Sequence, residues 1–210
     1  SIEAFSAVVQ WVLIPFMVVA GTNFALFWRA ITGEAGVFAR NDEFRFYAGV
    51  MAVLTALLAG MLLVGHGSGP AIHAVTPAAV EEAVRTAAFQ VVSIVTTTGY
   101  ASVDFELWDP VAQYVLLFGM FLGGSAGSTG GAIKMVRWLV ILKSLKRELF
   151  TSVHPEAVKP VRLGGRALDE RAVRGIYAFS MLYLVIFFVG AMLLMADAAR
   201  LDVALDLHEG

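Results

Sequence analysis

Four long runs of apolar residues divide the chain, and charged residues are sparse within each of them. The runs extend from Phe5 to Phe27, from Phe44 to Val64, from Val111 to about Gly131, and from Ile176 to Ala196. A helix rises about 1.5 Å per residue and the hydrocarbon core of a bilayer is about 30 Å thick, so a span needs about 20 such residues. The pattern therefore predicts an all-α integral membrane protein with four membrane spans.

A fifth segment, Pro77 to Val95, has the start signals of a helix but a shorter apolar part. Thr76 is a candidate N-cap and Pro77 suits the first helical position. Only Ala83 to Val95 is apolar, which is too short to cross a bilayer. We therefore expect a re-entrant helix that enters and leaves the membrane on the same side.

Composition supports the membrane assignment. The chain is 59% hydrophobic and 15% charged, whereas soluble domains average about 45–50% apolar and about 25% charged residues. The sequence contains no cysteine, which excludes a disulfide framework and a zinc–thiolate site. The net charge of −2 indicates no nucleic-acid partner. We expect no enzymatic activity and no covalently bound cofactor.

The basic residues are concentrated in two connections, which predicts the orientation. Only Arg85 and Arg200 lie elsewhere. By the positive-inside rule the two basic connections face the cytoplasm, and residues 66–110 face outside. The basic residues of these connections are Arg29, Arg40, Arg45, Lys134, Arg137, Lys143, Lys146, Arg147, Lys159, Arg162, Arg166, Arg171 and Arg174.

A threonine-rich stretch follows the re-entrant helix and is a candidate ion site. Its residues are Thr96, Thr97, Thr98, Gly99 and Tyr100. β-branched residues favour extended backbone, and glycine permits a positive φ. Backbone carbonyls at membrane depth are tolerated beside a water-filled path, where they replace the hydration shell of a cation. The alternative is a surface turn with Gly99 as the C′ residue of the helix.

Acidic residues outnumber basic ones between residues 66 and 110, which favours cations at the outer entrance. Among them, Asp104 is expected at the outer mouth, either bracing the end of the threonine stretch or adding to the negative field. The other acidic residues of this region are Glu81, Glu82, Glu106 and Asp109.

A glycine-rich run interrupts the third span and predicts a loop within the membrane. Glycines weaken a helix by about 0.5–1 kcal/mol each relative to alanine. A loop at this depth must be covered by protein or water, which places it beside the conduction path. The run consists of Gly123, Gly124, Ser125, Ala126, Gly127, Ser128, Thr129, Gly130 and Gly131.

Two other interpretations of this run remain open. Gly119, Gly123, Gly127 and Gly131 recur every four residues, as in a close helix–helix contact. Ser125 also lies in a Gly-x-Ser-x-Gly pattern, which suits an intramembrane serine hydrolase. That chemistry needs a histidine base, yet His66, His73, His154 and His208 all lie outside the apolar cores of the spans. For the chain as a whole, a helical membrane scaffold without an ion path is a further alternative.

Two motifs resemble those of the Trk/Ktr potassium uptake proteins, the TrkH/KtrB superfamily. The stretch from Ser93 to Ser102, with Asp104, Phe105 and Trp108, is similar to the family's third pore loop. The run from Gly123 to Lys134 is similar to the loop in its third repeat, except that Ala132 stands where glycine is common. Residues 16–24 and 43–47 also resemble the second repeat's end and the third repeat's start.

The resemblance implies a K⁺-channel-like architecture of four repeats, each with a helix, a re-entrant pore helix with its filter, and a second helix. It implies that Thr96–Tyr100 forms one quarter of a selectivity filter, with K⁺ at Thr97 and Thr98, and that Gly123–Gly131 is a gate. It also implies K⁺ as the transported ion, the bacterial inner membrane, a homodimer, and a cytoplasmic nucleotide-binding regulatory subunit.

The resemblance also divides the chain. Residues 1–43 correspond to the second helix of repeat two with its connection, and residues 44–147 to a complete repeat three. Residues 148–175 form a basic cytoplasmic loop, and residues 176–210 begin repeat four. Because the chain begins with Ser1 and ends soon after the last span, we expect a fragment whose partners are membrane lipid and the remaining repeats. One filter stretch cannot enclose an ion, so the fragment alone should conduct nothing.

Overall fold

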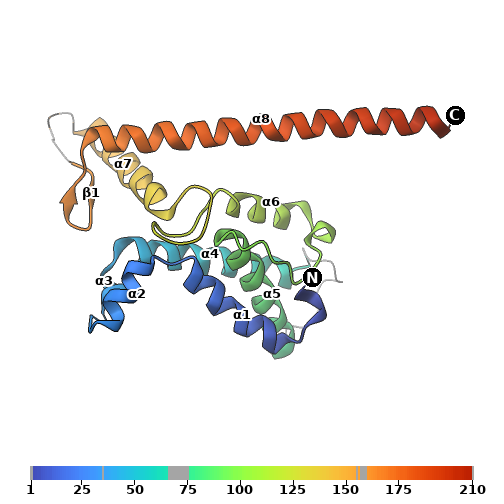
Figure 1. Cartoon of the computed structure of the whole chain (residues 1–210), viewed down its shortest axis with the longest axis horizontal. Coiled ribbons are helices and arrows are strands. Elements are labelled where there is room, and N and C mark those ends of the chain that lie inside the picture. Colours follow the sequence, from blue (N-terminus) through green and yellow to red (C-terminus); the bar gives the residue numbers. More distant parts are fainter. Residues whose placement is uncertain (1, 35, 66–75, 155, 157–159, 210) are drawn as a thin grey trace.

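The computed structural model describes residues 2–34, 36–65, 76–154, 156 and 160–209, with side chains described up to Arg200. Its elements follow one another from the N-terminus to the C-terminus as shown in Figure 1. They are η1 (Ile2–Ala4), α1 (Ala7–Ala20), α2 (Phe24–Ile31), α3 (Val37–Arg40), α4 (Asp42–Leu63), α5 (Pro77–Val95), η2 (Phe105–Leu107), α6 (Pro110–Gly119), α7 (Met135–Val153), β1 (Arg162–Leu163), β2 (Arg166–Ala167) and α8 (Glu170–Glu209).

Helix α5 packs against α4, α1 and α6 within the helical bundle. It begins at Pro77, where the Thr76 hydroxyl accepts a hydrogen bond from the Ala79 N–H at 3.3 Å. The predicted cap and the predicted range of this helix are both confirmed. Its apolar second half is buried on all sides, which explains why that half lacks an amphipathic pattern. The buried core includes Tyr47, Leu54, Leu58, Phe89, Val92, Val95, Trp108 and Leu116.

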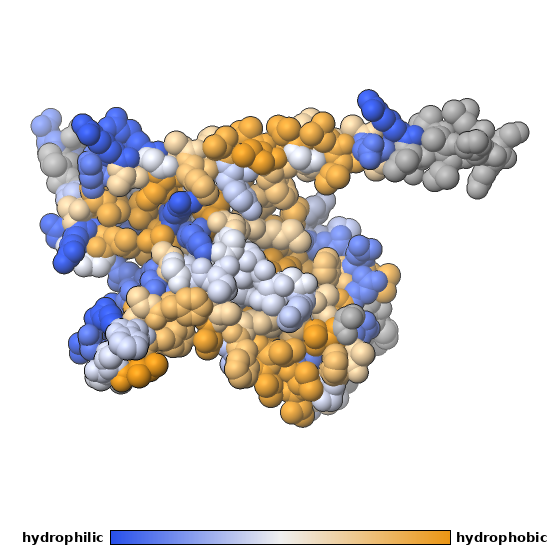
Figure 2. Space-filling model, viewed as in Figure 1, coloured by the Kyte–Doolittle hydropathy of each residue, from blue (hydrophilic) through white to orange (hydrophobic). Residues whose placement is uncertain are grey.

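Two helices of the described chain, α4 and α8, are long and apolar enough to cross a membrane. They contain the second and fourth predicted spans. Only 6% of the most apolar stretch of α8 is buried in the structure. Figure 2 shows hydrophobic side chains covering the middle of this helix. Figure 1 shows α8 lying apart from the bundle along most of its length. Its apolar surface is therefore available to lipid or to another protein segment.

The first predicted span is two helices instead of one. Helices α1 and α2 meet at a break of 96° between Ala20 and Phe24. The Asn23 side chain caps α2 by accepting a hydrogen bond from the Ala25 N–H at 2.9 Å. A Cβ at Gly21 would lie 2.5 Å from the Tyr47 hydroxyl. The sequence pattern missed the break because both halves are apolar, whereas capping and close packing decide where the helix ends.

The third predicted span is helical only at its start. Helix α6 ends at Gly119, and the glycine run that follows lies in irregular backbone until α7 begins at Met135. The loop prediction is therefore confirmed for the conformation of this run. The helix-packing interpretation is wrong, because Gly123, Gly127 and Gly131 do not share the face of one helix.

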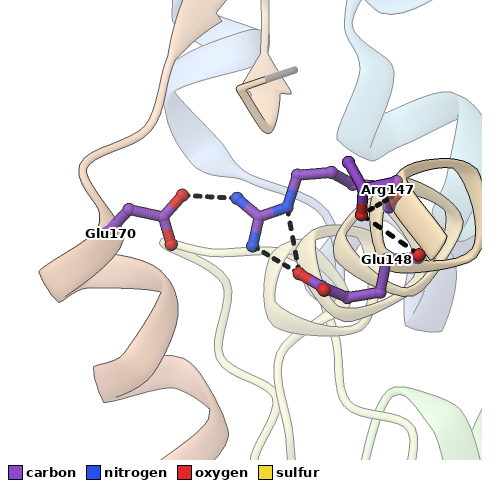
Figure 3. Close-up of polar contacts among 4 residues, drawn as sticks. Arg147, Glu148 and Glu170 are labelled. Carbon is purple, nitrogen blue, oxygen red and sulfur yellow. Dashed lines mark hydrogen bonds and ion pairs between the residues drawn. The ribbon is translucent and has the colours of Figure 1, made fainter. Parts of the chain in front are cut away.

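Beyond the loop, charged side chains fasten α7 to its neighbours. The guanidinium of Arg147 binds the carboxylate of Glu170, at the start of α8 (Figure 3). It also binds the carboxylate of Glu148, with an N–O distance of 2.9 Å. Hydrogen bonding to Glu170 and then to Glu148 raises the pKa of Arg147. Lys143 binds Asp42 at 2.9 Å, which joins α7 to the start of α4. Lys159, a predicted basic anchor, lies outside the described residues.

Candidate functional site

The threonine stretch begins with a tight turn that ends α5. The Thr98 N–H donates to the Ser93 carbonyl at 2.9 Å, and the Thr97 N–H donates to the Ile94 carbonyl at 3.0 Å. These two bonds form a Schellman motif in which Thr97 occupies the C′ position with φ +57°. The alternative prediction of a turn with Gly99 as the C′ residue is therefore wrong about that residue, because Thr97 occupies the C′ position. The prediction of extended backbone is also wrong for Thr96, which is helical in conformation.

Thr97 has a backbone conformation that β-branched residues rarely adopt. Such positions cost about 1–3 kcal/mol and persist only where the surroundings impose them. The predicted positive φ at Gly99 is confirmed, at +77°. A Cβ at Gly99 would meet no atom within 4 Å, so glycine is required there by backbone conformation and not by space.

Polar side chains of α5 hold the stretch after the turn. The Ser93 hydroxyl donates to the Tyr100 carbonyl at 2.6 Å, and the Gln90 amide donates to the Val103 carbonyl at 3.2 Å. The Thr96 hydroxyl donates to the Val92 carbonyl at 2.7 Å and lies 2.8 Å from the Thr98 hydroxyl. Gln90 thus joins α5 to the residues that follow the threonine stretch.

Four successive carbonyl oxygens accept no hydrogen bond from the part of the chain that the structure describes. They belong to Thr96, Thr97, Thr98 and Gly99. Thr97, Gly99 and Tyr100 are also exposed, while Thr96 is buried. Backbone carbonyls are obligatory acceptors, so a run of them needs water, an ion or another protein segment as partner. This arrangement is suited to coordination of a cation by oxygen.

The glycine run folds onto the break between α1 and α2. The Ser125 N–H donates to the Gly21 carbonyl at 2.9 Å, and the Thr129 N–H donates to the Ala20 carbonyl at 3.3 Å. These carbonyls are available because α1 stops at Ala20. The loop also closes on itself, since the Gly123 N–H donates to the Ile133 carbonyl at 2.9 Å. Backbone hydrogen bonds therefore provide much of what holds the loop.

Close contacts explain why two positions of the loop require glycine. A Cβ at Gly123 would lie 2.2 Å from the Gly131 carbonyl oxygen. A Cβ at Gly124 would lie 2.6 Å from the Ser128 hydroxyl and 2.8 Å from the Gly21 carbonyl oxygen. Side chains at these positions would push the loop away from its supports. Ala132 has a φ of +53°, a conformation that is strained for a residue with a Cβ.

The loop also touches the threonine turn. The Gly131 N–H donates to the Thr97 hydroxyl at 2.7 Å. A Cβ at Gly130 would lie 3.2 Å from the Thr96 carbonyl oxygen. The two motifs singled out in the sequence are therefore neighbours in space, although 34 residues separate the bonded pair.

Two charged side chains complete the site. The Glu43 carboxylate accepts a hydrogen bond from the Ala126 N–H at 2.6 Å. The Lys134 ammonium donates to the carbonyls of Ser128 and Gly130. In the sequence, Glu43 stands out only as part of the start of the third repeat, whereas Lys134 is both a basic residue of a predicted cytoplasmic connection and the last residue of the glycine-rich motif. Their positions beside the glycine run in space could not be derived from the apolar pattern.

The structure gives no support to the hydrolase interpretation. The Ser125 hydroxyl is buried, and no hydrogen-bond partner for it lies in the described ranges. His154 stacks on Phe150 at the far end of α7, with ring centroids 4.8 Å apart. His66 and His73 lie outside the described residues, as does the side chain of His208.

Asp104, expected at the outer mouth, is exposed and caps η2. Its carboxylate accepts a hydrogen bond from the Glu106 N–H at 3.0 Å. Elsewhere in the acidic group, Glu81 forms an ion pair with Arg85 at 3.0 Å and accepts the Trp11 indole N–H at 2.8 Å. Part of the negative charge is thus neutralised, and Asp104 has a local structural role.

Comparison with known proteins places these features in a family. The model of the TrkH family, described as a cation transport protein, matches residues 1–205. The chain is 33% identical over 192 residues to the Trk system potassium uptake protein TrkH of Escherichia coli K12, covering 91% of this chain and 38% of that protein. It is 34% identical over 188 residues to TrkH of Vibrio parahaemolyticus, covering 88% of this chain and 37% of that protein.

A solved structure agrees with the sequence comparisons. The crystal structure of the potassium transporter TrkH from Vibrio parahaemolyticus superposes with a TM-score of 0.78 at 31% identity. The match covers 89% of this chain and 39% of that one. The chain spans about 38% of the length of the curated relatives it matches. It is an α-helical membrane protein segment, and it belongs to the TrkH family of cation transport proteins.

Proposed function

We propose that this chain forms part of a K⁺ uptake pathway in the bacterial inner membrane. The observation that carries the proposal is the run of carbonyl oxygens from Thr96 to Gly99, which have no hydrogen-bond partner among the described residues. The similarity to proteins named as Trk system potassium uptake proteins supports K⁺ as the transported ion. No enzymatic step and no bound cofactor are needed for this function.

In this proposal Thr96–Tyr100 supplies one quarter of a selectivity filter. Backbone carbonyls, chiefly those of Thr97 and Thr98, would replace the hydration shell of K⁺. The threonine hydroxyls have other partners, since those of Thr96 and Thr97 bind the Val92 carbonyl and the Gly131 N–H. In this proposal the main ion ligands are main-chain carbonyl oxygens. The other three quarters would come from the remaining repeats of the full-length protein.

Gly123–Gly131 is the proposed gate below this filter. Its contact with Thr97 through Gly131 supports a position beside the candidate ion path. The loop has no continuous helical structure of its own, so a modest number of hydrogen bonds sets its position. Movement of the loop away from the α1–α2 break would open the path.

The proposal keeps the division of the chain given by the family resemblance. Residues 1–43 end repeat two, residues 44–147 form repeat three, residues 148–175 are a cytoplasmic loop, and residues 176–210 begin repeat four. The exposed apolar surface of α8 supports contact with lipid or a second copy in a homodimer. The basic residues around Lys143 and Arg147 suit docking of the cytoplasmic nucleotide-binding regulatory subunit.

The test is K⁺ uptake by bacteria that lack their own K⁺ uptake systems and express the full-length protein containing this segment. The unmodified protein should restore growth at low K⁺. Gly99→Ser should weaken discrimination against Na⁺, because serine is strained at a φ of +77°. Gly33→Ser is the matched control, since Gly33 also has a positive φ and open space but lies in the α2–α3 connection. Equal selectivity in all three proteins would refute the filter assignment.

A further inference from the structure

Glu43 is a buried carboxylate in the first turn of α4, with 8% of its surface exposed. Its Oε1 atom accepts the Ala126 N–H at 2.6 Å, across 83 residues of sequence. The Lys134 ammonium and the Val136 N–H also act on this carboxylate electrostatically. Burial disfavours the charged form of this carboxylate, and the glycine loop and Lys134 offset part of that cost.

Lys134, which follows the loop in sequence, also binds it through a charged group. Its ammonium donates to the Ser128 carbonyl at 3.4 Å and to the Gly130 carbonyl. The carboxylate therefore accepts a hydrogen bond from an N–H in the middle of the loop, while the ammonium donates hydrogen bonds to two carbonyls in its second half. Each charged group also attracts the other. Charge-assisted hydrogen bonds of this kind are stronger than those between neutral groups.

Helix α4 also contacts the end of α1, against which the loop rests. One turn after Glu43, the Tyr47 hydroxyl donates to the Val18 carbonyl at 3.1 Å, near the end of α1. Tyr47 is fully buried, so its position is fixed by the core. The start of α4 thus contacts both the loop and the helix break against which the loop rests. A carboxylate here is well placed to set the position of the loop.

We propose that Glu43 is a positioning residue that fastens the glycine loop in its obstructing position. The inference rests on the proposed gate, because it assigns the latch of that same loop. Release of the Ala126 N–H from the carboxylate frees the loop from α4 while leaving the filter turn intact. Loss of the latch should therefore increase opening without changing which ion is preferred.

The experiment measures loop exposure and ion flux separately in the full-length protein. Ser125→Cys is the probe, because Ser125 is buried and its hydroxyl has no partner among the described residues. This chain contains no other cysteine, and cysteines elsewhere in the protein are replaced. The rate of labelling by a water-soluble thiol reagent reports exposure of the loop. K⁺ flux and the K⁺/Na⁺ preference are measured in proteoliposomes without the probe.

Glu43→Ala should increase both the labelling rate and the K⁺ flux about tenfold or more, as expected for loss of a charged hydrogen bond. Glu43→Gln keeps an oxygen acceptor but no charge, and should give a smaller increase. Asp42→Asn is the matched control, since the neighbouring carboxylate binds Lys143. It should label at the unmodified rate.

Unchanged labelling in both Glu43 variants would overturn the latch and leave the proposed gate standing. Faster labelling with unchanged flux would support the latch but refute the loop as the gate. If Glu43→Ala fails to accumulate in the membrane, Glu43→Gln decides. Faster labelling of Glu43→Gln supports the latch, and unchanged labelling overturns it.

Discussion

The hydroxyl of Thr97 accepts a hydrogen bond from the backbone N–H of Gly131 at 2.7 Å, which joins the threonine turn to the glycine loop. Thr97 is also the residue whose backbone is strained, with φ +57°. A conformation that is costly by itself is thus combined with a contact to the segment proposed to move. Movement of Gly131 away from Thr97 would break this bond.

Removal of this hydroxyl should loosen the loop. Thr97→Val keeps the branched shape but cannot accept the Gly131 N–H, and a net loss of about 0.5–1.5 kcal/mol is expected. The account predicts higher K⁺ flux and a lower thermal unfolding midpoint for the full-length protein. Thr151→Val is the control, because the Thr151 hydroxyl binds a carbonyl of its own helix, α7. Equal effects of the two substitutions would argue against a special role for Thr97.

A side chain at Gly124 should displace the loop from the helix break. The Cβ of Gly124→Ala would lie 2.8 Å from the Gly21 carbonyl oxygen, and overpacking of this kind costs about 1–3 kcal/mol. We expect a lower unfolding midpoint in detergent and increased flux. Gly60→Ala in α4 provides the comparison, since its Cβ meets no atom within 4 Å. That substitution should leave stability unchanged or slightly higher.

Replacing Ala132 by glycine should relieve backbone strain. Ala132 has a φ of +53°, and a left-handed conformation costs about 1–2 kcal/mol for residues with a Cβ. Ala132→Gly should therefore raise the unfolding midpoint, although the greater freedom of glycine in the unfolded chain offsets part of the gain. Ala52→Gly in the exposed middle of α4 should instead lower it by about 1 kcal/mol. A fall in stability for both variants would contradict the strain argument.

The link between α7 and α8 should depend on salt. Arg147 pairs with Glu170 and Glu148, whose side chains are 59% and 63% exposed, so about 0–1 kcal/mol is expected from each pair. Arg147→Gln should lower the unfolding midpoint slightly at low ionic strength. Because salt screens exposed charges, the difference from the unmodified protein should shrink at high salt. A difference that is independent of salt would indicate packing of the side chain as its main contribution.

Local signals in the sequence predict several elements well. The bounds of α5 follow from Thr76 and Pro77 at its start and from the threonines after Val95. The spans containing α4 and α8 follow from length and apolarity. The positive φ of Gly99 follows from the freedom of glycine in a turn. Each of these features depends on residues close together in the chain.

The structural features that depend on contacts between residues far apart in the chain are not predicted from the sequence. The break after Ala20 is stabilised by N–H groups of Ser125 and Thr129, more than 100 residues away. The Glu43–Ala126 bond joins two segments that no periodicity connects. Thr97 adopts the left-handed conformation although glycine stands two positions later. Tertiary contacts override local preference at these sites, so a single sequence does not reveal them.

The most direct test of the central claim is anomalous scattering from Rb⁺, used in place of K⁺, in crystals of the full-length protein. The account predicts Rb⁺ density within coordination distance of the carbonyl oxygens of Thr96, Thr97, Thr98 or Gly99. Excess Na⁺ should leave this density in place in the unmodified protein and weaken it in Gly99→Ser. Rb⁺ bound elsewhere along the path, with none beside this stretch, would contradict the assignment of Thr96–Tyr100 as a filter.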